Sequence, residues 1–418
     1  MTDPDLNQVL LNPKCCTKKA VLPWLNGWGG KGLLNAVNAP ENIIKTIKEA
    51  HLLGLGGSGF PTYIKWQSVA DNVAPDKYLI CNGNEDEPGT FKDRVLLEQT
   101  PFQLIEGATI AAIACGINHV VFYINPHLEN AIQVVSNALK EWQSSDIYAR
   151  VLQTLDVTIS YTIVKSNGIY IGGEETAVIQ TIEGKFPFPT GKPPYPTEQG
   201  VYGSPTLINN IETLCNVPHI MRNGAQWFYN LGRNDSAGTK LYTISGDVES
   251  PGVYELPMGI SLSELIDKYG SGMLHQTRLK SVITGGPSNS MLTAKDLDVS
   301  LDFTSLESRG ASLGTGAMIV ISDADHIVQS ISEYVNFFAG ASCGQCPPCK
   351  TGTYFLAQII AKIDSNKATY ADLEQLTDLC RILPGSGKCH LVDGAVKLVK
   401  SSLNHFKDEY EKLLIKRE

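Results

Sequence analysis

The chain has 418 residues, of which 43% are hydrophobic and 18% are charged. This composition supports folded cores and excludes an intrinsically disordered protein, and at roughly 150 residues per domain the length predicts two or three domains. The formal net charge of −9 argues against a general nucleic-acid binder. No apolar run reaches the roughly 18 residues of a transmembrane helix, and the N-terminal sequence lacks the pattern of a secretory signal.

Residues 1–45 are mixed in composition, and we expect them to form an extension wrapped on the body of the protein. Strand-like and helix-like runs then alternate from residue 46 to residue 235. This alternation is typical of an α/β domain with an open, largely parallel sheet. The expected strands are Tyr78–Cys81, His119–Ile124 and Val157–Val164, and the expected helices are Pro40–Leu53, Phe102–Cys115 and Glu129–Trp142.

The composition changes after residue 235. Short β-prone runs separated by Gly and Pro, with one helix near Ser261–Lys268, predict a small α+β domain over residues 236–324. In residues 325–418, Gly and Pro are concentrated in one cysteine-containing loop and one turn. This last segment therefore predicts a helical bundle.

Three cysteines, Cys343, Cys346 and Cys349, form two C-x-x-C steps that share the middle residue. Three thiolates at this spacing suit three corners of a [4Fe–4S] cluster. Cys389 is the preferred fourth ligand, and Cys380 is a weaker candidate because it lies in an apolar helical pattern. The alternative is a structural zinc site, which also uses four cysteines.

The other cysteines are expected to be buried thiols. Ten cysteines in 418 residues are too few for a disulfide scaffold, and their clustering indicates a reducing compartment and a metal site. One reservation concerns the adjacent pair Cys15 and Cys16, which could be redox-active.

A glycine-rich loop follows the first expected helix, with Gly54, Gly56, Gly57 and Gly59 followed by Lys65. Glycines allow backbone N–H groups to point at a phosphate, and a lysine adds positive charge. The loop is not the G-x-G-x-x-G fingerprint, and clustered glycines alone are often only turns. The pattern therefore favours phosphate or nucleotide binding without specifying it.

Two further polar loops lie near expected strand ends, where ligands of α/β sheets collect. The first, residues 81–94, contains Asn82, Asn84, Glu85 and Glu87, and its alternative reading is a solvated acidic loop. The second, residues 168–185, contains a Gly-Gly-Glu-Glu turn at 172–175 that is expected to open a helix. Its carboxylates could bind ribose hydroxyls or simply complement the helix dipole.

Downstream, the segments KPPYP and SPTLINNIETL supply an aromatic side chain, Tyr195, and two adjacent amides, Asn209 and Asn210. Four such loops in one α/β domain, upstream of a cysteine cluster, predict a binding site rather than packing alone.

Six motifs occur in order between Gly54 and the C-terminal region: GLGGSGFPT, NEDEPGTFKDR, YIGGEETA, KPPYP, SPTLINNIETLCNVP and SCGQCPPCK. Together they resemble the NADH-binding flavoprotein subunit of respiratory complex I, the 51-kDa type, and the related diaphorase subunits of NAD-linked hydrogenases and formate dehydrogenases. The resemblance covers most of the chain.

The resemblance implies an NADH dehydrogenase with bound FMN and one [4Fe–4S] cluster. A hydride passes from NADH to FMN, and electrons then pass singly through the cluster to partner subunits. The implied fold is a Rossmann-like FMN and NADH domain, a small ubiquitin-like domain of the SLBB type, and a C-terminal helical bundle that carries the cluster.

The resemblance also implies roles for individual residues. The implied FMN contacts are Gly54, Gly56, Lys65, Asn82, Asn84, Glu85, Tyr170, Gly173, Glu174, Asn209 and Asn210. The implied NADH contacts are Gly57, Ser58, Phe60, Glu87, Glu175 and Tyr195. The implied cluster ligands are Cys343, Cys346, Cys349 and Cys389. Glu85 and Lys65 are expected to act at the reacting centre, and Glu175 is expected to repel the 2′-phosphate of NADPH.

The chain departs from the family pattern at several positions. Leu55 stands where the family usually has arginine, Asn84 where it has aspartate, Gly172 where it has cysteine, and an aromatic residue is replaced near Ser68. Loss of the arginine and the acid could shift the flavin potential or the affinity for pyridine nucleotides. The glycine loop that contains Leu55 is also similar to that of the NADH-binding subunit of ion-pumping ferredoxin–NAD oxidoreductases. This relationship is less favoured because the downstream acidic motif of those enzymes is different.

The resemblance implies a small thioredoxin-like [2Fe–2S] subunit and further iron–sulfur or catalytic subunits as partners, in the cytoplasm or at the cytoplasmic face of a membrane. Three alternatives stay open: a diaphorase subunit of a soluble formate dehydrogenase or hydrogenase, a cluster-bearing scaffold with a decayed flavin site, and a zinc-stabilised interaction module.

Overall fold

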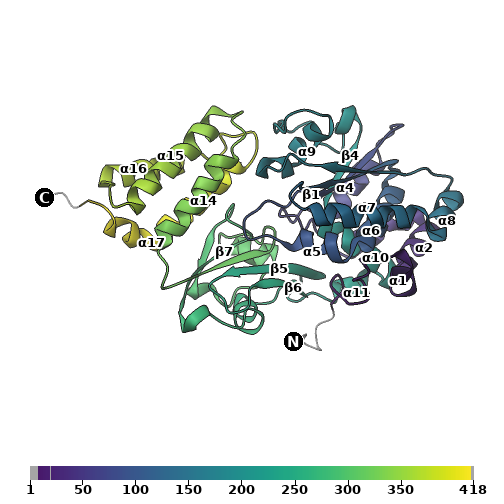
Figure 1. The fold of residues 1–418 in the computed structure, drawn as a ribbon, viewed down its shortest axis with the longest axis horizontal. Helices are drawn as coiled ribbons and strands as arrows, with labels where there is room; N and C mark the ends of the chain where they lie inside the picture. The colour runs from purple at the N-terminus through teal and green to yellow at the C-terminus, as the bar shows by residue number, and fades with distance from the viewer. Residues whose placement is uncertain (1–7, 19, 416–418) are drawn as a thin grey trace.

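In the computed structural model, which describes residues 8–18 and 20–415, three groups of elements lie side by side (Figure 1). Residues 1–7, 19 and 416–418, which belong to the expected N-terminal extension and helical bundle, lie outside the described residues. The first group is built on a parallel sheet with the strand order β3-β2-β1-β4. Its strands are β1 Tyr78–Gly83, β2 His119–Ile124, β3 Ser160–Lys165 and β4 Thr206–Asn210.

The register of this sheet places distant polar residues next to one another. Asn82 at the end of β1 lies opposite Tyr123 of β2 on one side and Asn210 of β4 on the other. Because all four strands run in the same direction, their carboxyl ends share one edge, where ligands of open α/β sheets bind. The sheet therefore gathers the polar loops at one place.

Helices cover this sheet. Most of α6 is buried, and Gly107 allows α6 to approach α10 so closely that a Cβ atom there would lie 2.0 Å from the carbonyl oxygen of Leu214. The helices of this group are α1 Val21–Asn26, α2 Lys31–Asn38, α3 Ile43–Glu49, α4 Thr62–Ala70, α5 Lys92–Gln99, α6 Pro101–Cys115, α7 Glu129–Gln143, α8 Asp146–Leu155, α9 Glu175–Ile182, α10 Ile211–Asn223 and α11 Ala225–Tyr229. Short 3₁₀ turns are η1 Pro40–Asn42, η2 Tyr170–Gly173 and η3 Val201–Gly203.

The second group is a mixed five-stranded sheet with the order β6-β5-β9-β7-β8, in which only the β5–β9 pair is parallel. Its strands are β5 Thr239–Gly246, β6 Gly252–Pro257, β7 Leu279–Thr284, β8 Met291–Thr293 and β9 Ala317–Ser322. Its helical turns are α12 Leu262–Glu264, the π-turn η4 Leu265–Tyr269, η5 Leu274–Gln276, η6 Ala294–Asp296 and α13 Phe303–Ser308. Its core also takes in Leu55 from the glycine loop of the first group.

The third group consists of α14 Ile327–Ala341, α15 Pro347–Asp364, α16 Tyr370–Ile382 and α17 Leu391–Lys412. They pack around a hydrophobic cluster that includes Val335, Phe338 and Leu356 and that also takes in Ile283 and Ile319 of the second sheet. Among the described helices, none combines the length and hydropathy that a membrane span requires.

The expected α/β, α+β and helical segments all appear, with corrections in detail. The expected helix Pro40–Leu53 is split between η1 and α3 and ends at Glu49, and the expected strand Val157–Val164 begins only at Ser160. The N-terminal segment is more regular than expected because it contains α1 and α2. Among the elements that were not expected, β4 in the segment SPTLINNIETL and α5 at the end of the acidic loop belong to the site.

Two buried carboxylates attach the N-terminal segment to the rest of the protein. Glu106 of α6 accepts hydrogen bonds from Trp24 Nε1 at 2.8 Å and from the backbone N–H groups of Gly30 and Leu33 at 2.8 and 3.1 Å. Glu255 of β6 accepts from the backbone N–H groups of residues 9–11 at 2.8–3.0 Å. The segment is therefore an integral part of the fold.

We expect Glu106→Ala to lower the free energy of unfolding by roughly 3 to 5 kcal/mol, because it leaves three buried donors without an acceptor. Urea unfolding followed by circular dichroism measures this loss. The control is Glu141→Ala, an exposed position on α7, which should unfold like the unchanged protein. A loss of equal size in both variants would contradict this role of Glu106.

Candidate functional site

Two cavities meet at the carboxyl edge of the parallel sheet. The first has a volume of about 530 Å³ and the second about 670 Å³, and both lie in the size range of cofactor and ligand pockets. They share Gly56, Asn82, Glu174 and Asn210 as common wall. The space is therefore suited to a bound nucleotide and a second ligand beside it.

All the residues that the sequence assigned to cofactor binding line one or both of these cavities. The first cavity is lined by Gly56, Gly57, Asn82, Asn84, Glu85, Glu87, Tyr170, Gly173, Glu174 and Asn210. The second is lined by Gly54, Gly56, Ser58, Phe60, Lys65, Asn82, Glu174, Glu175, Tyr195, Asn209 and Asn210. The fold thus brings together loops that are far apart in the sequence.

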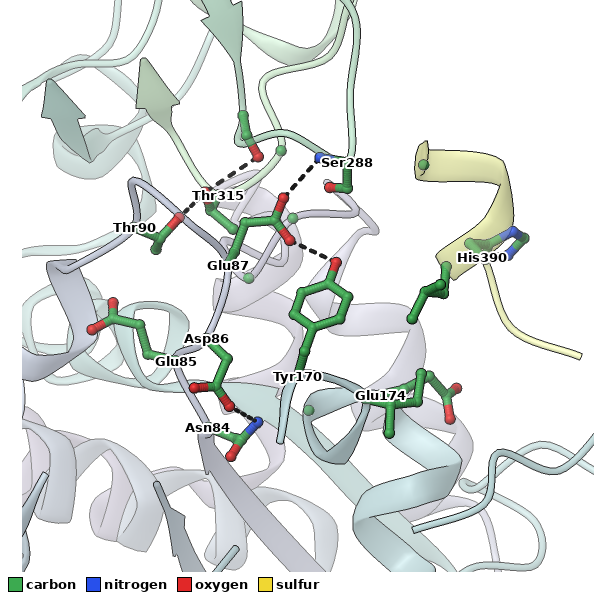
Figure 2. A pocket seen from close by; sticks show the side chains of 18 of the residues that line it. Asn84, Glu85, Asp86, Glu87, Thr90, Tyr170, Glu174, Ser288, Thr315 and His390 are labelled. Atoms are coloured by element: carbon green, nitrogen blue, oxygen red, sulfur yellow. Dashed lines mark hydrogen bonds between the residues drawn. The ribbon is translucent and has the colours of Figure 1, made fainter. Parts of the chain in front are cut away.

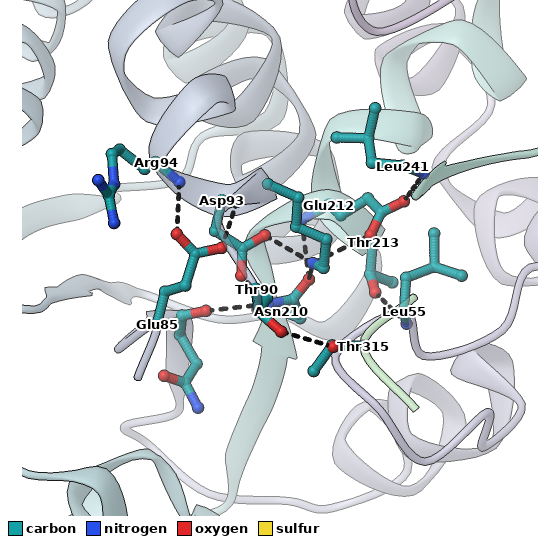
Figure 3. Close-up of polar contacts among 12 residues, drawn as sticks. Leu55, Glu85, Thr90, Asp93, Arg94, Asn210, Glu212, Thr213, Leu241 and Thr315 are labelled. Carbon is teal, nitrogen blue, oxygen red and sulfur yellow. Dashed lines mark hydrogen bonds and ion pairs between the residues drawn. The ribbon is translucent and has the colours of Figure 1, made fainter. Parts of the chain in front are cut away.

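Glu85 lies in the first cavity wall and caps a helix. Its two carboxylate oxygens accept from the backbone N–H groups of Asp93 at 2.7 Å and Arg94 at 3.1 Å, at the start of α5 (Figure 3). Burial, together with the neighbouring Asp93, raises the pKa of Glu85 to about 7, although the nearby Lys92 and the two N–H donors oppose the rise. The charge of this side chain therefore changes near neutral pH.

Glu87 joins the first and second groups of elements. It accepts from the Tyr170 hydroxyl at 2.6 Å and from the backbone N–H of Ser288 at 2.9 Å, as Figure 2 shows. The hydroxyls of Thr90 and Thr315 make a second link across the same boundary at 2.7 Å. The first cavity therefore has walls from both domains.

Glu175, the first residue of α9, forms ion pairs with Lys65 and Lys192 in the second cavity. Burial alone would raise the pKa of Glu175, but the two ammonium groups outweigh it and lower that pKa. Glu175 is therefore ionised, yet its charge is balanced locally. Its expected repulsion of a 2′-phosphate is thus weakened in this arrangement, which the sequence did not indicate.

The two main departures from the family pattern lie in different surroundings. The Leu55 side chain is only 1% exposed and packs in the core of the second sheet domain, so it does not line either cavity. Asn84 does line the first cavity, and its Nδ2 atom donates to Asp86 at 3.0 Å. Of the two, only Asn84 is placed to act directly on a bound ligand.

The four expected cluster ligands surround one small cavity. Cys343, Cys346, Cys349 and Cys389 line it together with the loop before α15 and the turn before α17. Cys346 caps α15, and its Sγ atom accepts from the backbone N–H of Lys388 at 3.4 Å. Such N–H groups stabilise thiolate ligands, so the donor set fits an iron–sulfur cluster.

Cys380 does not join this group. It lies on α16, is 5% exposed and belongs to the apolar core of the bundle. Within residues 8–18 and 20–415, no three His, Cys, Asp or Glu side chains lie close enough together to ligate a single metal ion.

The remaining cysteines are free thiols, and most of them are buried. Burial raises the pKa of Cys15 far above its usual range, and its Sγ atom donates to the carbonyl oxygen of Val9 at 3.3 Å. Such a thiol is poorly reactive, which weighs against redox activity of the Cys15–Cys16 pair.

Several residues at the site had not been assigned from the sequence. They come from the loop between β7 and β8, the loop before β9, the start of α5 and the start of α17: Gly285, Ser288, Asn289, Gly314, Thr315, Thr90, Lys92, Asp93, His390, Asp393 and Lys397. The GGPSNS and FKDR segments were the available signals, but nothing local indicates that they face the same cavity.

The comparisons with known proteins agree with this geometry. Residues 47–219 match the family model described as the Nuo51 FMN-binding domain, residues 241–288 match the SLBB domain, and residues 329–413 match the NADH-ubiquinone oxidoreductase-F iron-sulfur binding region. The fold class and the two cofactors expected from the sequence are thereby confirmed.

Among curated proteins, the NADH-quinone oxidoreductase F 2 subunit of Rhizobium meliloti (strain 1021) is 40% identical over 92% of this chain and 92% of its own length. The NADH-quinone oxidoreductase F subunit of Aquifex aeolicus (strain VF5) is 36% identical over 97% of this chain and 94% of its own length.

Among solved structures, an NAD⁺-reducing [NiFe]-hydrogenase in the H₂-reduced state matches with a TM-score of 0.84 and 33% identity, over 95% of this chain and 67% of that chain. The likeness thus extends over nearly the whole of this chain in both kinds of comparison. The chain belongs to the family of NADH-quinone oxidoreductase F subunits, with an FMN-binding domain and a 4Fe-4S-binding region.

Proposed function

We propose that this chain is the electron-entry subunit of a multi-subunit complex, in which it oxidises NADH and delivers electrons to partner subunits. One observation carries the proposal: the first cofactor cavity and the cysteine cavity share Ile171, Cys389 and Leu391 as wall. A ligand in the first cavity would therefore lie next to a cluster held by the cysteines. When bound, FMN supplies the step from two-electron hydride chemistry to single-electron transfer.

Residues of both the first and the second cavity would hold FMN. The backbone N–H of Gly54 donates to the Phe60 carbonyl oxygen at 2.8 Å and holds the loop closed, and the backbone N–H of Gly56 in the same loop would bind the FMN phosphate, which is the usual function of such glycine loops. Asn82, Asn209 and Asn210 stand at the strand ends and would contact its polar edges. Lys65, Asn84, Glu85, Tyr170, Gly173 and Glu174 complete the proposed FMN contacts.

The open side of the second cavity would hold NADH. Phe60 and Tyr195 are 42% and 54% exposed, which leaves their rings accessible for stacking on adenine. Glu175 would accept from the adenosine ribose after release from Lys65 or Lys192. The proposed NADH contacts are completed by Ser58 of the second cavity and by Gly57 and Glu87 of the first, so NADH would extend from the second cavity into the first. Cys343, Cys346, Cys349 and Cys389 are the proposed cluster ligands.

The proposed partners are a small [2Fe–2S] protein and further iron–sulfur subunits that receive electrons from the cluster. None of the ten cysteines, all of which lie in the described residues, forms a disulfide, which supports a reducing compartment such as the cytoplasm. The second candidate is the NAD⁺-reducing subunit of a hydrogenase-type enzyme, favoured by the structural likeness to such an enzyme. The two differ in the direction of electron flow.

Anaerobic addition of NADH to the purified protein tests the proposal. We expect bleaching of the flavin absorbance at about 450 nm, because the bound flavin accepts the hydride. NADPH is the comparison, and it should bleach the band more slowly. A flavin that binds but stays oxidised with NADH would contradict the NADH-oxidising direction, and failure to bind added FMN would contradict the flavin site.

We expect Cys389→Ser to lose most of the cluster signal in electron paramagnetic resonance of the reduced protein, with iron content well below about four per chain. The matched control is Cys380→Ser, which changes the other candidate thiol in the same region and should retain iron. If Cys389→Ser keeps its full iron content, or if Cys380→Ser loses iron, Cys380 rather than Cys389 is the fourth cluster ligand.

We expect Glu85→Gln to change how the flavin midpoint potential depends on pH. Because the pKa of Glu85 is about 7, its carboxyl becomes negative as pH rises through this value, and the added charge makes the flavin harder to reduce. Between about pH 6 and pH 8 the potential of the unchanged protein should therefore fall more steeply than that of Glu85→Gln. The control is Glu129→Gln, an exposed position on α7. Equal slopes in all three proteins would remove this role of Glu85.

A further inference from the structure

A buried cluster of charges lies behind the wall that the two cavities share. Lys92, on the first turn of α5, is 1% exposed, and its ammonium group has three partners. It lies 2.7 Å from Asp93 Oδ1, 3.0 Å from Glu212 Oε2 and 3.0 Å from Asn210 Oδ1. The contacts with Asp93 and Asn210 are hydrogen bonds and the contact with Glu212 is an ion pair, so the charge of Lys92 is engaged within the protein and acts on the site through these neighbours.

The principal neighbour is Asn210. Its Oδ1 atom accepts from Lys92 and from the backbone N–H of Glu212, and its Nδ2 atom donates to Asp93 Oδ2 at 2.7 Å. These contacts leave one orientation of the amide, because exchange of its oxygen and nitrogen would oppose donor to donor and acceptor to acceptor. Nδ2 also donates to the backbone carbonyl oxygen of Asn82 at 3.4 Å, so the donors and acceptors of the amide are all used within the protein. Asn210 lies on the wall common to both cavities, so this network fixes the shape of that wall.

The second ammonium group comes from the other sheet domain. Lys240 of β5 is fully buried, forms an ion pair with Glu212 and donates to the carbonyl oxygen of Leu55 in the glycine loop at 3.3 Å. The next residue, Leu241, donates its backbone N–H to Glu212 Oε1 at 2.7 Å (Figure 3). The second domain therefore contacts both the glycine loop and Glu212, which forms an ion pair with Lys92 beside Asn210.

The cluster contains three carboxylates, from Glu85, Asp93 and Glu212, and two ammonium groups. Burial lowers the pKa of Lys240 to about 8, a fall that Glu212 opposes, so Lys240 is charged at neutral pH. Burial acts against the charge of Lys92 as well, but Asp93 and Glu212 outweigh it and raise its pKa. Loss of either ammonium group would leave an unpaired buried carboxylate next to the cavities.

We propose that Lys92 and Lys240 are positioning residues of the cofactor site: as a pair contributed by two domains, they fix the Asn210 amide and the glycine loop and balance the buried carboxylates of Asp93 and Glu212. The second sheet domain is then a functional part of the site rather than a spacer. This inference rests on the proposed function, in which FMN occupies these cavities.

Charge-removing variants of the full chain test the proposal by their affinity for FMN. Lys240→Met leaves Glu212 short of one counter-charge, and the FMN phosphate would meet this excess negative charge, so we expect the Kd for FMN to rise by about 10-fold or more. The double variant Lys240→Met/Glu212→Gln removes one charge of each sign and should recover to within about 3-fold of the unchanged protein. The control is Lys295→Met, an exposed lysine of the same domain.

The flavin midpoint potential gives a second readout, which a purely structural role would not move in a charge-dependent way. It should fall in Lys240→Met and recover in the double variant. The inference is overturned if folded Lys240→Met binds FMN as tightly as Lys295→Met, or if the double variant binds as weakly as Lys240→Met. If Lys240→Met does not fold, the variant Glu212→Gln tests the charge balance instead. An affinity for FMN equal to or tighter than that of the unchanged protein supports the charge balance. A rise of the Kd for FMN by about 10-fold overturns it.

These outcomes are distinct from failure of the proposed function. If the unchanged protein, supplied with FMN, does not bind it, the flavin site itself is wrong. If the unchanged protein binds FMN and the variants bind it equally well, only the role of the two lysines is wrong.

Discussion

The parallel, in-register pairing of β1 with β2 and β4 is the constraint on which the site depends. It places Asn82 beside Asn210 although the two residues are far apart in the sequence. The glycine loop then closes over this edge: a Cβ atom on Gly56 would lie 2.8 Å from Cβ of Asn210, so only glycine permits this approach. Backbone hydrogen bonds of the sheet thus set the relative positions of the polar side chains before any of them binds a ligand.

The second constraint is that no single domain completes the cavities. Glu87 reaches across to the backbone of Ser288, and Lys240 reaches back to the carbonyl oxygen of Leu55. The C-terminal helical region adds Cys389 and Leu391 to the same wall. Because each domain supplies part of the boundary, a small change in their packing would alter both the shape of the cofactor space and its separation from the cysteine site.

Local patterns in the sequence predicted those elements whose burial follows from their own periodicity. The apolar run His119–Ile124 is β2 with the expected ends, and the apolar run at 102–115 became α6. By contrast, β4 carries two amides and resembles a polar loop, since its place in the sheet comes from tertiary pairing with β1. Lys92 lies in a charged segment typical of an exposed surface, and only partners from α10 and its own acidic neighbour bury it. The motifs therefore predicted which residues form the site, whereas the ion pairs among them could be identified only from the fold.

The pairing of charges has a consequence for how the site would bind phosphate. Lys65 and Lys192 form ion pairs with Glu175, and Glu174 lies 3.9 Å from Lys192. Lys92 and Lys240 are paired with Asp93 and Glu212, so these lysines offer little uncompensated positive charge. Leu55, where the family usually has arginine, faces the core of the second domain and adds none. Phosphate binding would therefore rely on the backbone N–H groups of the glycine loop, or on release of Lys65 from Glu175 when a nucleotide arrives. The second route would couple ribose recognition to phosphate recognition, because the carboxylate freed for the ribose hydroxyls is the one that had held the lysine.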